Sequence, residues 1–158
     1  MEIRFAKMSD VPAILDLLRQ VGQVHHEGRP DIFRLGAQKY SASEVINLLD
    51  DPNNPIFIAA EGDKVLGYGF CQMIKHEKDP VMTDRLELYL DDLCVDESTR
   101  GKGVGKALYE AIRKYAKDRK CHSVSLNVWC CNKTAERFYV NLGLTPRKTY
   151  MEELLDAE

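Results

Sequence analysis

The residues of this sequence that could do chemistry are concentrated in one glycine-rich stretch, Arg100-Gly101-Lys102-Gly103-Val104-Gly105-Lys106. It follows an alternating apolar run and precedes a helical one, so it lies between a predicted strand and a predicted helix. A helix N-terminus carries free backbone N–H groups and a partial positive charge, and glycines let an anion approach those groups closely. Arg100, Lys102 and Lys106 add positive charge. The stretch is therefore predicted to bind phosphate.

The spacing of the glycines excludes two common phosphate-binding motifs. Gly-x-x-x-x-Gly-Lys-Ser/Thr is excluded because Ala107 follows Lys106 and Arg100 stands at the first glycine position. Gly-x-Gly-x-x-Gly is excluded because position 106 is lysine. The pattern that remains is Arg-x-x-Gly-x-Gly. On the glycines alone, a flexible turn with solvated lysines is the alternative interpretation.

The elements that must position this loop form a β-α-β unit. A strand is predicted over Arg85–Val95, a helix over Ala107–Tyr115 and a second strand over Val124–Val128. A further helix is predicted over Thr134–Leu142, ending at Gly143, and a last strand over residues 150–155.

The N-terminal half supplies the remaining elements. They are a strand over residues 3–6, a helix that begins at Ser9-Asp10-Val11-Pro12 and ends at Gly22, a loop over residues 24–30, a second helix behind the Ser41/Glu44 capping box, and a hairpin of Ile56–Ala60 with Val65–Ile74. The order β-α-α-β-β-β-α-β-α-β predicts a mixed α/β chain.

Length and composition predict one globular domain. The chain has 158 residues, of which 44% are hydrophobic and 30% charged. The 22 basic and 25 acidic residues give a net charge of −3, which argues against a general electrostatic attraction to nucleic acid. No apolar run is long enough to span a bilayer and the first residues form no signal peptide, so we expect a cytoplasmic protein without a membrane partner.

The cysteines indicate neither a disulfide framework nor a metal site. There are five of them, none in a Cys-x-x-Cys pair: Cys71, Cys94, Cys121, Cys130 and Cys131. Cys121-His122 lacks a partner cluster, so no metal is expected. No His/Asn pattern supports a catalytic thiolate at Cys130 or Cys131.

Two segments resemble the motifs of the GNAT (Gcn-related) N-acetyltransferase superfamily. Val95–Leu108 is similar to its motif A and Asn132–Leu144 to its motif B. The resemblance covers nearly the whole chain and implies one GNAT domain over residues 1–158. It implies a central twisted mixed sheet of about six to seven strands with a splayed cleft, flanked by about four helices. It also implies direct transfer of an acetyl group from acetyl-CoA to a primary amine.

The resemblance assigns residues to the cofactor. The backbone of the strand end would pair with the pantetheine arm, the N–H groups of the glycine loop would hold the pyrophosphate, and motif B would line the other side. The implied contacts are Leu93, Cys94, Val95, Arg100, Gly101, Lys102, Gly103, Val104, Gly105, Lys106, Asn132, Ala135, Phe138 and Tyr139. For Asn132, a helix cap is an equally compatible role.

Acyl transfer from a thioester needs a neutral amine, donors for the oxyanion and a proton for the departing thiolate. An ammonium with a pKa near 10.4 is neutral in only about one molecule in 2,500 at pH 7. Tyr139 matches the motif B tyrosine that protonates the sulfur in many relatives, and a phenol is a plausible donor. Packing of Phe138 and Tyr139 on the buried face of their helix, or orientation of the cofactor, is the alternative.

The general base is not carried over from the family. Two positions where relatives place a glutamate hold Tyr89 and Asn127 here. Instead, Tyr89–Val95 resembles the Tyr-Leu-Glu-Asp segment of diamine and polyamine acetyltransferases, where paired acids lie near a cationic substrate. Adjacent residues of a regular strand point to opposite faces, so we expect one carboxylate to reach the cleft, Asp92 before Asp91, unless a bulge changes the parity. A solvated strand end is the alternative.

Candidate contacts for the acceptor lie mainly after the first predicted helix. His25-His26-Glu27 and Phe33 follow the first helix, where relatives often cover the acceptor, and Tyr89 joins them as a candidate contact. Trp129 is a candidate for the cleft mouth or for packing. Adjacent histidines in a polar loop are also common surface residues.

These assignments predict an acetyltransferase for a small cationic amine, of the diamine, polyamine or amino-acid type. The alternatives are a protein N-terminal or lysine acetyltransferase, which Asn127 disfavours in the N-terminal case, and a catalytically idle CoA-binding domain. Apolar residues at a sheet edge over Tyr150–Leu155 predict a homodimer, because unpaired edges invite pairing.

Overall fold

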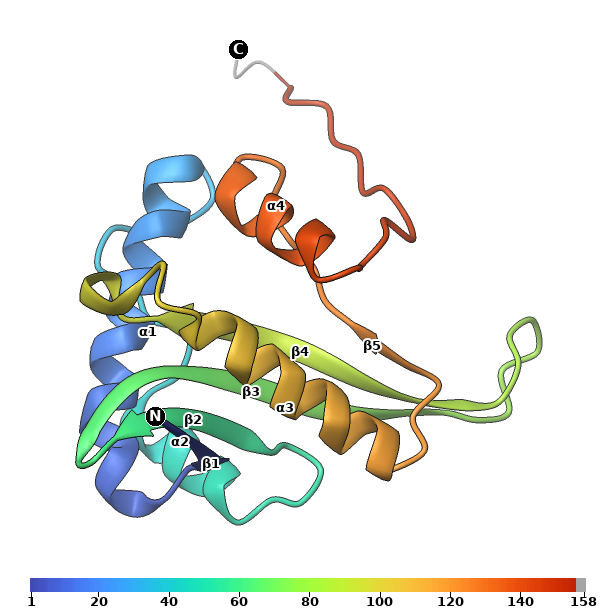
Figure 1. Cartoon of the computed structure of the whole chain (residues 1–158). Coiled ribbons are helices and arrows are strands. Elements are labelled where there is room, and N and C mark those ends of the chain that lie inside the picture. Colours follow the sequence, from blue (N-terminus) through green and yellow to red (C-terminus); the bar gives the residue numbers. More distant parts are fainter. Residues whose placement is uncertain (156–158) are drawn as a thin grey trace. The chain divides into compact units, whose positions relative to one another are not determined.

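The computed structural model describes residues 1–155 (Figure 1). The chain divides into two compact units, Met1–Asn127 and the segment from Val128 onward. The first unit contains a five-stranded sheet in the order β1-β2-β3-β4-β5, in which β4 and β5 are parallel and the other pairs antiparallel. Its strands are β1 (Glu2–Phe5), β2 (Ile56–Glu61), β3 (Lys64–His76), β4 (Arg85–Val95) and β5 (Ser123–Ser125). The prediction of a mixed sheet is confirmed.

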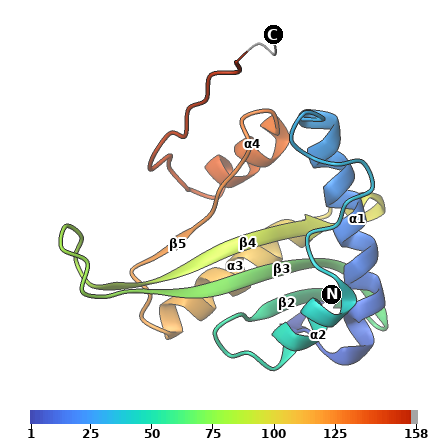
Figure 2. The ribbon, with the colours of Figure 1, turned by 180° about the vertical axis from the view of Figure 1, so that it is seen from behind.

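Helices cover both faces of this sheet. Figures 1 and 2 show α3 (Val104–Asp118) crossing one face, with α1 (Val11–Gly28) and α2 (Ala42–Leu49) on the other. Two glycines of β3 let α3 approach, because an added Cβ would lie 3.2 Å from Leu108 Cδ1 at Gly67 and 2.7 Å from Ile112 Cδ1 at Gly69. Short 3₁₀ helices, η1 (Met8–Asp10) and η2 (Glu97–Thr99), precede α1 and α3. Within residues 1–155, no helix has the length and apolar character needed to cross a membrane.

The first helix is longer than the sequence predicts. α1 runs through Gly22 to Gly28, so the prediction of a loop at residues 24–30 is wrong for most of that stretch. Gly22 permits close packing rather than ending the helix, since an added Cβ would lie 2.2 Å from the Ala37 carbonyl oxygen. Asp10 precedes the helix without capping it through its side chain, because its carboxylate binds the Arg4 guanidinium at 2.7 Å.

The long strand β4 contains a bulge at Asp91. The register with β3 pairs Asp92 with Phe70 and Leu90 with Cys71, which leaves Asp91 as the extra residue. Along the edge of β4 that faces away from β3, β5 pairs only with Glu87–Tyr89. Within the described chain, no strand pairs with this edge of β4 from Leu90 onward. Among the described residues, this backbone edge of β4 is therefore unpaired alongside the bulge and beyond it.

The second unit contains α4 (Lys133–Asn141). Asn132 caps its start, the role that the sequence leaves open beside a cofactor contact, because its side chain accepts a hydrogen bond from the Ala135 N–H at 3.1 Å. Its end is also as predicted, with Gly143 at φ 91° and the Leu144 N–H donating to the Tyr139 carbonyl at 3.1 Å.

The predicted last strand is wrong. Residues 150–155 adopt no strand, and all six side chains are exposed. A strand requires a neighbour that satisfies its backbone groups, and this segment is paired with none among the described residues. The strand predicted over Val124–Val128 is also shorter, ending at Ser125. The sheet therefore has five strands in residues 1–155, rather than six to seven.

Candidate functional site

The strand edge that the splayed sheet exposes is the first part of the site. Leu93, Cys94 and Val95 pair on one side with Gly69, Tyr68 and Gly67 of β3. The other side of the same backbone faces no strand in residues 1–155, so it can form a ladder with an extended ligand. The Cys94 side chain contributes nothing to that edge. It is buried, its thiol donates to the Leu17 carbonyl, and burial raises its pKa to about 12.

The predicted phosphate loop forms the second part. Gly101 and Gly103 take φ values of 78° and 82°, a left-handed conformation that side chains disfavour, and Gly103 immediately precedes α3. The first internal hydrogen bond of α3 is from the Ala107 N–H to the Gly103 carbonyl, at 3.0 Å. The preceding N–H groups, those of residues 104–106, therefore point out of the helix end.

The loop leaves room for an anion. A Cβ added at Gly101 or Gly103 would have no atom within 4 Å. Two of the three basic side chains fold back on the loop, with Arg100 Nε donating to the Val95 carbonyl at 3.1 Å and Lys102 Nζ to the Ser98 carbonyl at 3.2 Å. Lys106 lies 3.8 Å from Glu110 on α3. These residues fit a phosphate-bearing ligand such as CoA.

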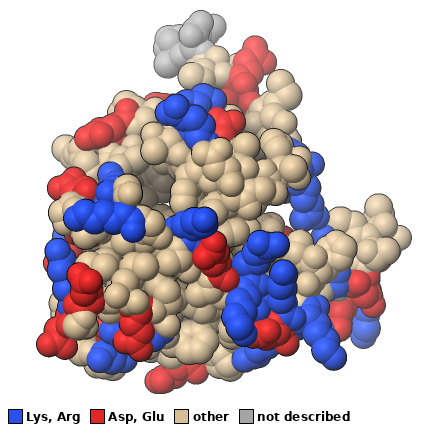
Figure 3. Space-filling view, in the orientation of Figure 1, with Lys and Arg blue, Asp and Glu red and all other residues tan. Residues whose placement is uncertain are grey.

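The outer face of α3 carries further charge. Its exposed basic residues are Lys106, Arg113, Lys114 and Lys117, followed by Arg119 and Lys120. Figure 3 shows Lys and Arg gathered over the face that α3 covers, with Asp and Glu among them. One of these acidic residues, Asp118, forms an ion pair with Lys114 at 2.6 Å.

The bulge places both acidic residues on one face of the sheet, which the sequence did not predict. Asp92 pairs with Phe70 and so shares the face of Tyr68 and Phe70, which belongs to the core under α1 and α2. Asp91 turns to the same side, where its carboxylate accepts a hydrogen bond from the Tyr40 hydroxyl. The expectation that the two carboxylates point to opposite faces of the strand is therefore wrong, because the extra residue removes the alternation of a regular strand. Of the two, Asp91 lines the pocket described next.

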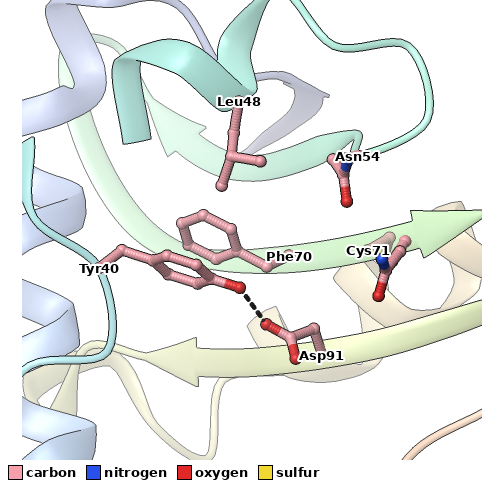
Figure 4. Close-up of a pocket in the computed structure, with 7 residues that line it drawn as sticks. Tyr40, Leu48, Asn54, Phe70, Cys71 and Asp91 are labelled. Atoms are coloured by element: carbon pink, nitrogen blue, oxygen red, sulfur yellow. Dashed lines mark hydrogen bonds between the residues drawn. The ribbon is translucent and has the colours of Figure 1, made fainter. Parts of the chain in front are cut away.

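Asp91 lies at the edge of a small pocket of about 90 Å³ (Figure 4). Tyr40 stacks on Phe70 with ring centroids 5.0 Å apart, and its hydroxyl donates to Asp91 Oδ2 at 2.5 Å. The Lys39 ammonium lies 2.8 Å from Asp91 Oδ1. Burial, followed by the bond to Asp91, raises the pKa of Tyr40, so its hydroxyl keeps its proton and remains a donor. The pocket is lined by Tyr40, Leu48, Asn54, Phe70, Cys71, Gln72 and Asp91.

Asp92 lies deeper than Asp91. Its Oδ2 accepts from the Tyr68 hydroxyl at 2.8 Å, and Tyr68 packs edge-on against Phe70 with centroids 5.0 Å apart. Burial raises the pKa of Asp92 to about 6, while the Tyr68 bond and the Lys39 charge oppose that rise. A carboxyl with this pKa exchanges protons near neutral pH, as a general base must.

The predicted acceptor residues lie on the last turns of α1 and in the segment that follows. His25 packs on the Phe33 ring with centroids 4.9 Å apart, and His26 Nδ1 lies 2.7 Å from the Phe33 carbonyl oxygen. Burial and the nearby Lys39 charge lower the pKa of His25. The histidines are thus half-buried, whereas Glu27 is exposed and accepts from Gln23 of its own helix at 2.9 Å.

Tyr89 and Asn127, the two positions where relatives place a glutamate, contact one another. The Asn127 amide donates to the Tyr89 hydroxyl at 2.9 Å. Neither side chain carries a carboxylate, so neither can act as a carboxylate base.

Motif B residues lie in the second unit. Phe138 and Tyr139 of α4 are half-buried, with ring centroids 5.1 Å apart, and Asn132 caps the helix. Trp129 is exposed on the segment before α4, and its carbonyl accepts from the Asn132 N–H at 2.8 Å. Cys130 and Cys131 are exposed thiols.

Sequence reasoning missed four residues around the carboxylates: Lys39, Tyr40, Tyr68 and Phe70. Tyr68 and Phe70 are two apart on a strand, which signals a shared face. Lys39 and Tyr40 lie between two helices and carry no pattern that places them against Asp91.

Comparison with known proteins identifies the family of this chain. The acetyltransferase (GNAT) family matches residues 22–144. The chain is 27% identical over 151 residues to the thialysine N-epsilon-acetyltransferase of Sus scrofa, which covers 89% of this chain and 82% of that protein. A mutant of the BH1408 protein from Bacillus halodurans is 31% identical with a TM-score of 0.93, over 98% of this chain and 99% of that one.

A further solved structure shares the fold. An aminoglycoside N-acetyltransferase in complex with CoA is 15% identical with a TM-score of 0.73, over 99% of this chain and 100% of that one. The family match spans most of the chain, so the protein belongs to the acetyltransferase (GNAT) family. It is an N-acetyltransferase that depends on acetyl-CoA.

The raised pKa of Asp92 predicts how the stability of the protein depends on pH. A folded-state pKa of about 6 lies above the unfolded value of about 4, so the folded state binds more protons and stability falls as pH rises through that window. Asp92→Asn removes the buried charge. We expect its free energy of unfolding to exceed the wild-type value by about 1–3 kcal/mol at pH 8 and to lose most of that gain by pH 4.

Urea unfolding at pH 4, 6 and 8 measures this difference. The control is Asp63→Asn, because Asp63 is an exposed carboxylate in the turn between β2 and β3. A gain that is the same at all three pH values would contradict a buried, titrating Asp92.

Proposed function

We propose that this protein transfers the acetyl group of acetyl-CoA to the primary amine of a small cationic molecule, of the diamine, polyamine or amino-acid type. The observation that carries the proposal is the pair of carboxylates that the bulge turns to one face of β4, directly before the free strand edge. Asp91 lines the pocket and Asp92 is buried next to it in the chain, so their negative charge attracts an ammonium and offers an acceptor for its proton.

The two carboxylates are proposed to divide the work. Asp91, more exposed and bonded by Tyr40, anchors the ammonium of the acceptor. Asp92, with a pKa of about 6, receives the proton directly or through water. A carboxylate near pKa 4 would be a weaker base for this purpose, because the proton must come from a group with a pKa near 10.4. The burial that raises the pKa of Asp92 thus reduces the difference between its pKa and that of the ammonium.

The cofactor is proposed to bind along the exposed edge and the loop. The backbone of Leu93–Val95 pairs with the pantetheine arm, and the N–H groups of Gly101–Lys106 bind the pyrophosphate, which the open space beside the two glycines accommodates. Acetyl-CoA supplies an activated acyl group as a thioester. Asn132, Ala135, Phe138 and Tyr139 are proposed to contact it from α4, so that both units form one GNAT domain over residues 1–158.

The acceptor is proposed to be small. The pocket beside Asp91 is only about 90 Å³, and it is lined by side chains from α2, from the segments before and after α2, and from β3 and β4. The relatives that match the chain over most of its length are named for the ε-amine of thialysine, an amino acid with an aliphatic amine. His25, His26, Glu27, Phe33 and Tyr89 are proposed to contact the rest of the acceptor.

Turnover of an amine panel tests this function. We expect acetyl-CoA-dependent release of free thiol with 1,4-diaminobutane, spermidine, lysine or thialysine, and none with the buffer alone.

If Tyr139 is the general acid, Tyr139→Phe lowers kcat about 10²–10⁴-fold and leaves acetyl-CoA affinity nearly unchanged. Tyr115→Phe is the matched control, because it also removes one phenol hydroxyl, from a ring of α3 that packs against Phe5 and Phe57. A Tyr139→Phe enzyme with full kcat would contradict the acid role.

The pyrophosphate assignment is tested at Gly103. Gly103→Val should weaken acetyl-CoA binding at least tenfold in calorimetric titration, because the new side chain fills the open space beside the helix end. Gly62→Val is the matched control. Gly62 also has a positive φ, 58°, and open space around it, but it lies in the turn between β2 and β3. Equal loss of affinity in both variants would indicate backbone strain alone.

A homodimer is the proposed oligomeric state. The C-terminal segment exposes four apolar side chains, those of Tyr150, Met151, Leu154 and Leu155, with exposed fractions of 94%, 85%, 72% and 84%. Apolar residues this exposed favour association. Light scattering at micromolar concentration should give twice the monomer mass, and Leu154→Asp should lower it. A monomeric mass for the unchanged chain would contradict the dimer.

A further inference from the structure

A primary amine of the chain itself lies on the carboxylate that the proposed function assigns to the acceptor. Lys39 Nζ is 2.8 Å from Asp91 Oδ1 and donates a second hydrogen bond to the Asp91 backbone carbonyl at 3.1 Å. The other oxygen of the carboxylate accepts from Tyr40. Both oxygens of Asp91 are therefore engaged by the segment between α1 and α2.

The backbone on both sides of Lys39 is held in place. Tyr40 is fixed by its stacking on Phe70, and the Ala37 carbonyl rests against Gly22 of α1. The Lys39 side chain itself is 44% exposed, so solvent and a ligand can reach it. Its ammonium can leave Asp91 without disturbing the loop that carries it.

The Lys39–Asp91 ion pair changes the net charge that an incoming ammonium meets at the pocket. Asp91 and Asp92 together carry up to two negative charges, and Lys39 compensates one of them. His25, whose pKa is lowered, adds no charge at neutral pH. An incoming ammonium must displace Lys39 from Asp91 or share the carboxylate with it, and like charges at one carboxylate repel.

We propose that Lys39 is a tethered competitor for the ammonium of the acceptor and so sets the affinity and charge selectivity of the acceptor site. This inference rests on the proposed function, because it takes Asp91 as the ammonium anchor. Lys39 lowers the affinity for every amine, and it does so most for a dication, which would otherwise meet both carboxylates uncompensated.

Kinetics of Lys39→Met with two amines test the proposal. For 1,4-diaminobutane we expect KM to fall roughly two- to fivefold, the range for a part-exposed ion pair, with a smaller change in kcat. For 1-aminobutane, which carries one charge, we expect a smaller fall. Lys39→Arg keeps the competing charge and should retain the wild-type KM.

Lys114→Met is the charge-matched control. It removes one positive charge from α3, where Lys114 pairs with Asp118, and should leave both KM values unchanged. An unchanged or higher KM in Lys39→Met would overturn the proposal. A higher KM confined to lysine or thialysine would instead make Lys39 a binding partner for the acceptor carboxylate.

Direct binding separates this inference from the proposed function. Should the wild-type enzyme acetylate no amine of the panel, the proposed function fails, and calorimetric titration of 1,4-diaminobutane still decides the role of Lys39. Tighter binding to Lys39→Met than to the wild-type protein supports the competitor. Equal affinity, or no binding to either protein, overturns it.

Discussion

One extra residue in β4 determines the arrangement of the whole site. Without the bulge at Asp91, two adjacent carboxylates would point to opposite faces, one of them toward α3. With it, both turn to the face of Tyr68 and Phe70, where two tyrosine hydroxyls bind them. The pairing of β4 with β5 also stops at Tyr89, two residues before the bulge, so the acidic pair and the free strand edge lie side by side along one strand.

The surroundings hold this irregular strand in place at some cost in stability. Phe70 packs between Tyr40 and Tyr68, so the rings that bind the carboxylates are themselves fixed. Farther along β4, the Cys94 thiol donates to the Leu17 carbonyl, and Gln20 of α1 donates to Asp96 at 3.2 Å. A carboxylate buried in such a place opposes folding when it is ionised, a common feature of sites whose chemistry needs a shifted pKa.

The segment between α1 and α2 connects the helical layer to the acidic pair. Its Ala37 carbonyl fits against Gly22, its Tyr40 stacks on β3, and its Lys39 reaches Asp91. Phe33 of the same segment contacts His25 and His26 on the last turns of α1. All of these contacts are made by a connection between two helices, so substitutions there can change the surroundings of Asp91 without altering the strand that carries the free edge.

The sequence by itself determined the family, the glycine loop before α3, the capping box of α2 and the caps of α4, because each depends on residues close together in the chain. It also selected Asp91 and Asp92. Only the tertiary structure decided that both share one face, that Gly22 lies within a helix, and that residues 150–155 form no strand. Bulges, close packing and strand pairing depend on partners far away in the sequence, such as Phe70, Ala37 and Tyr40, and local patterns carry no information about those partners.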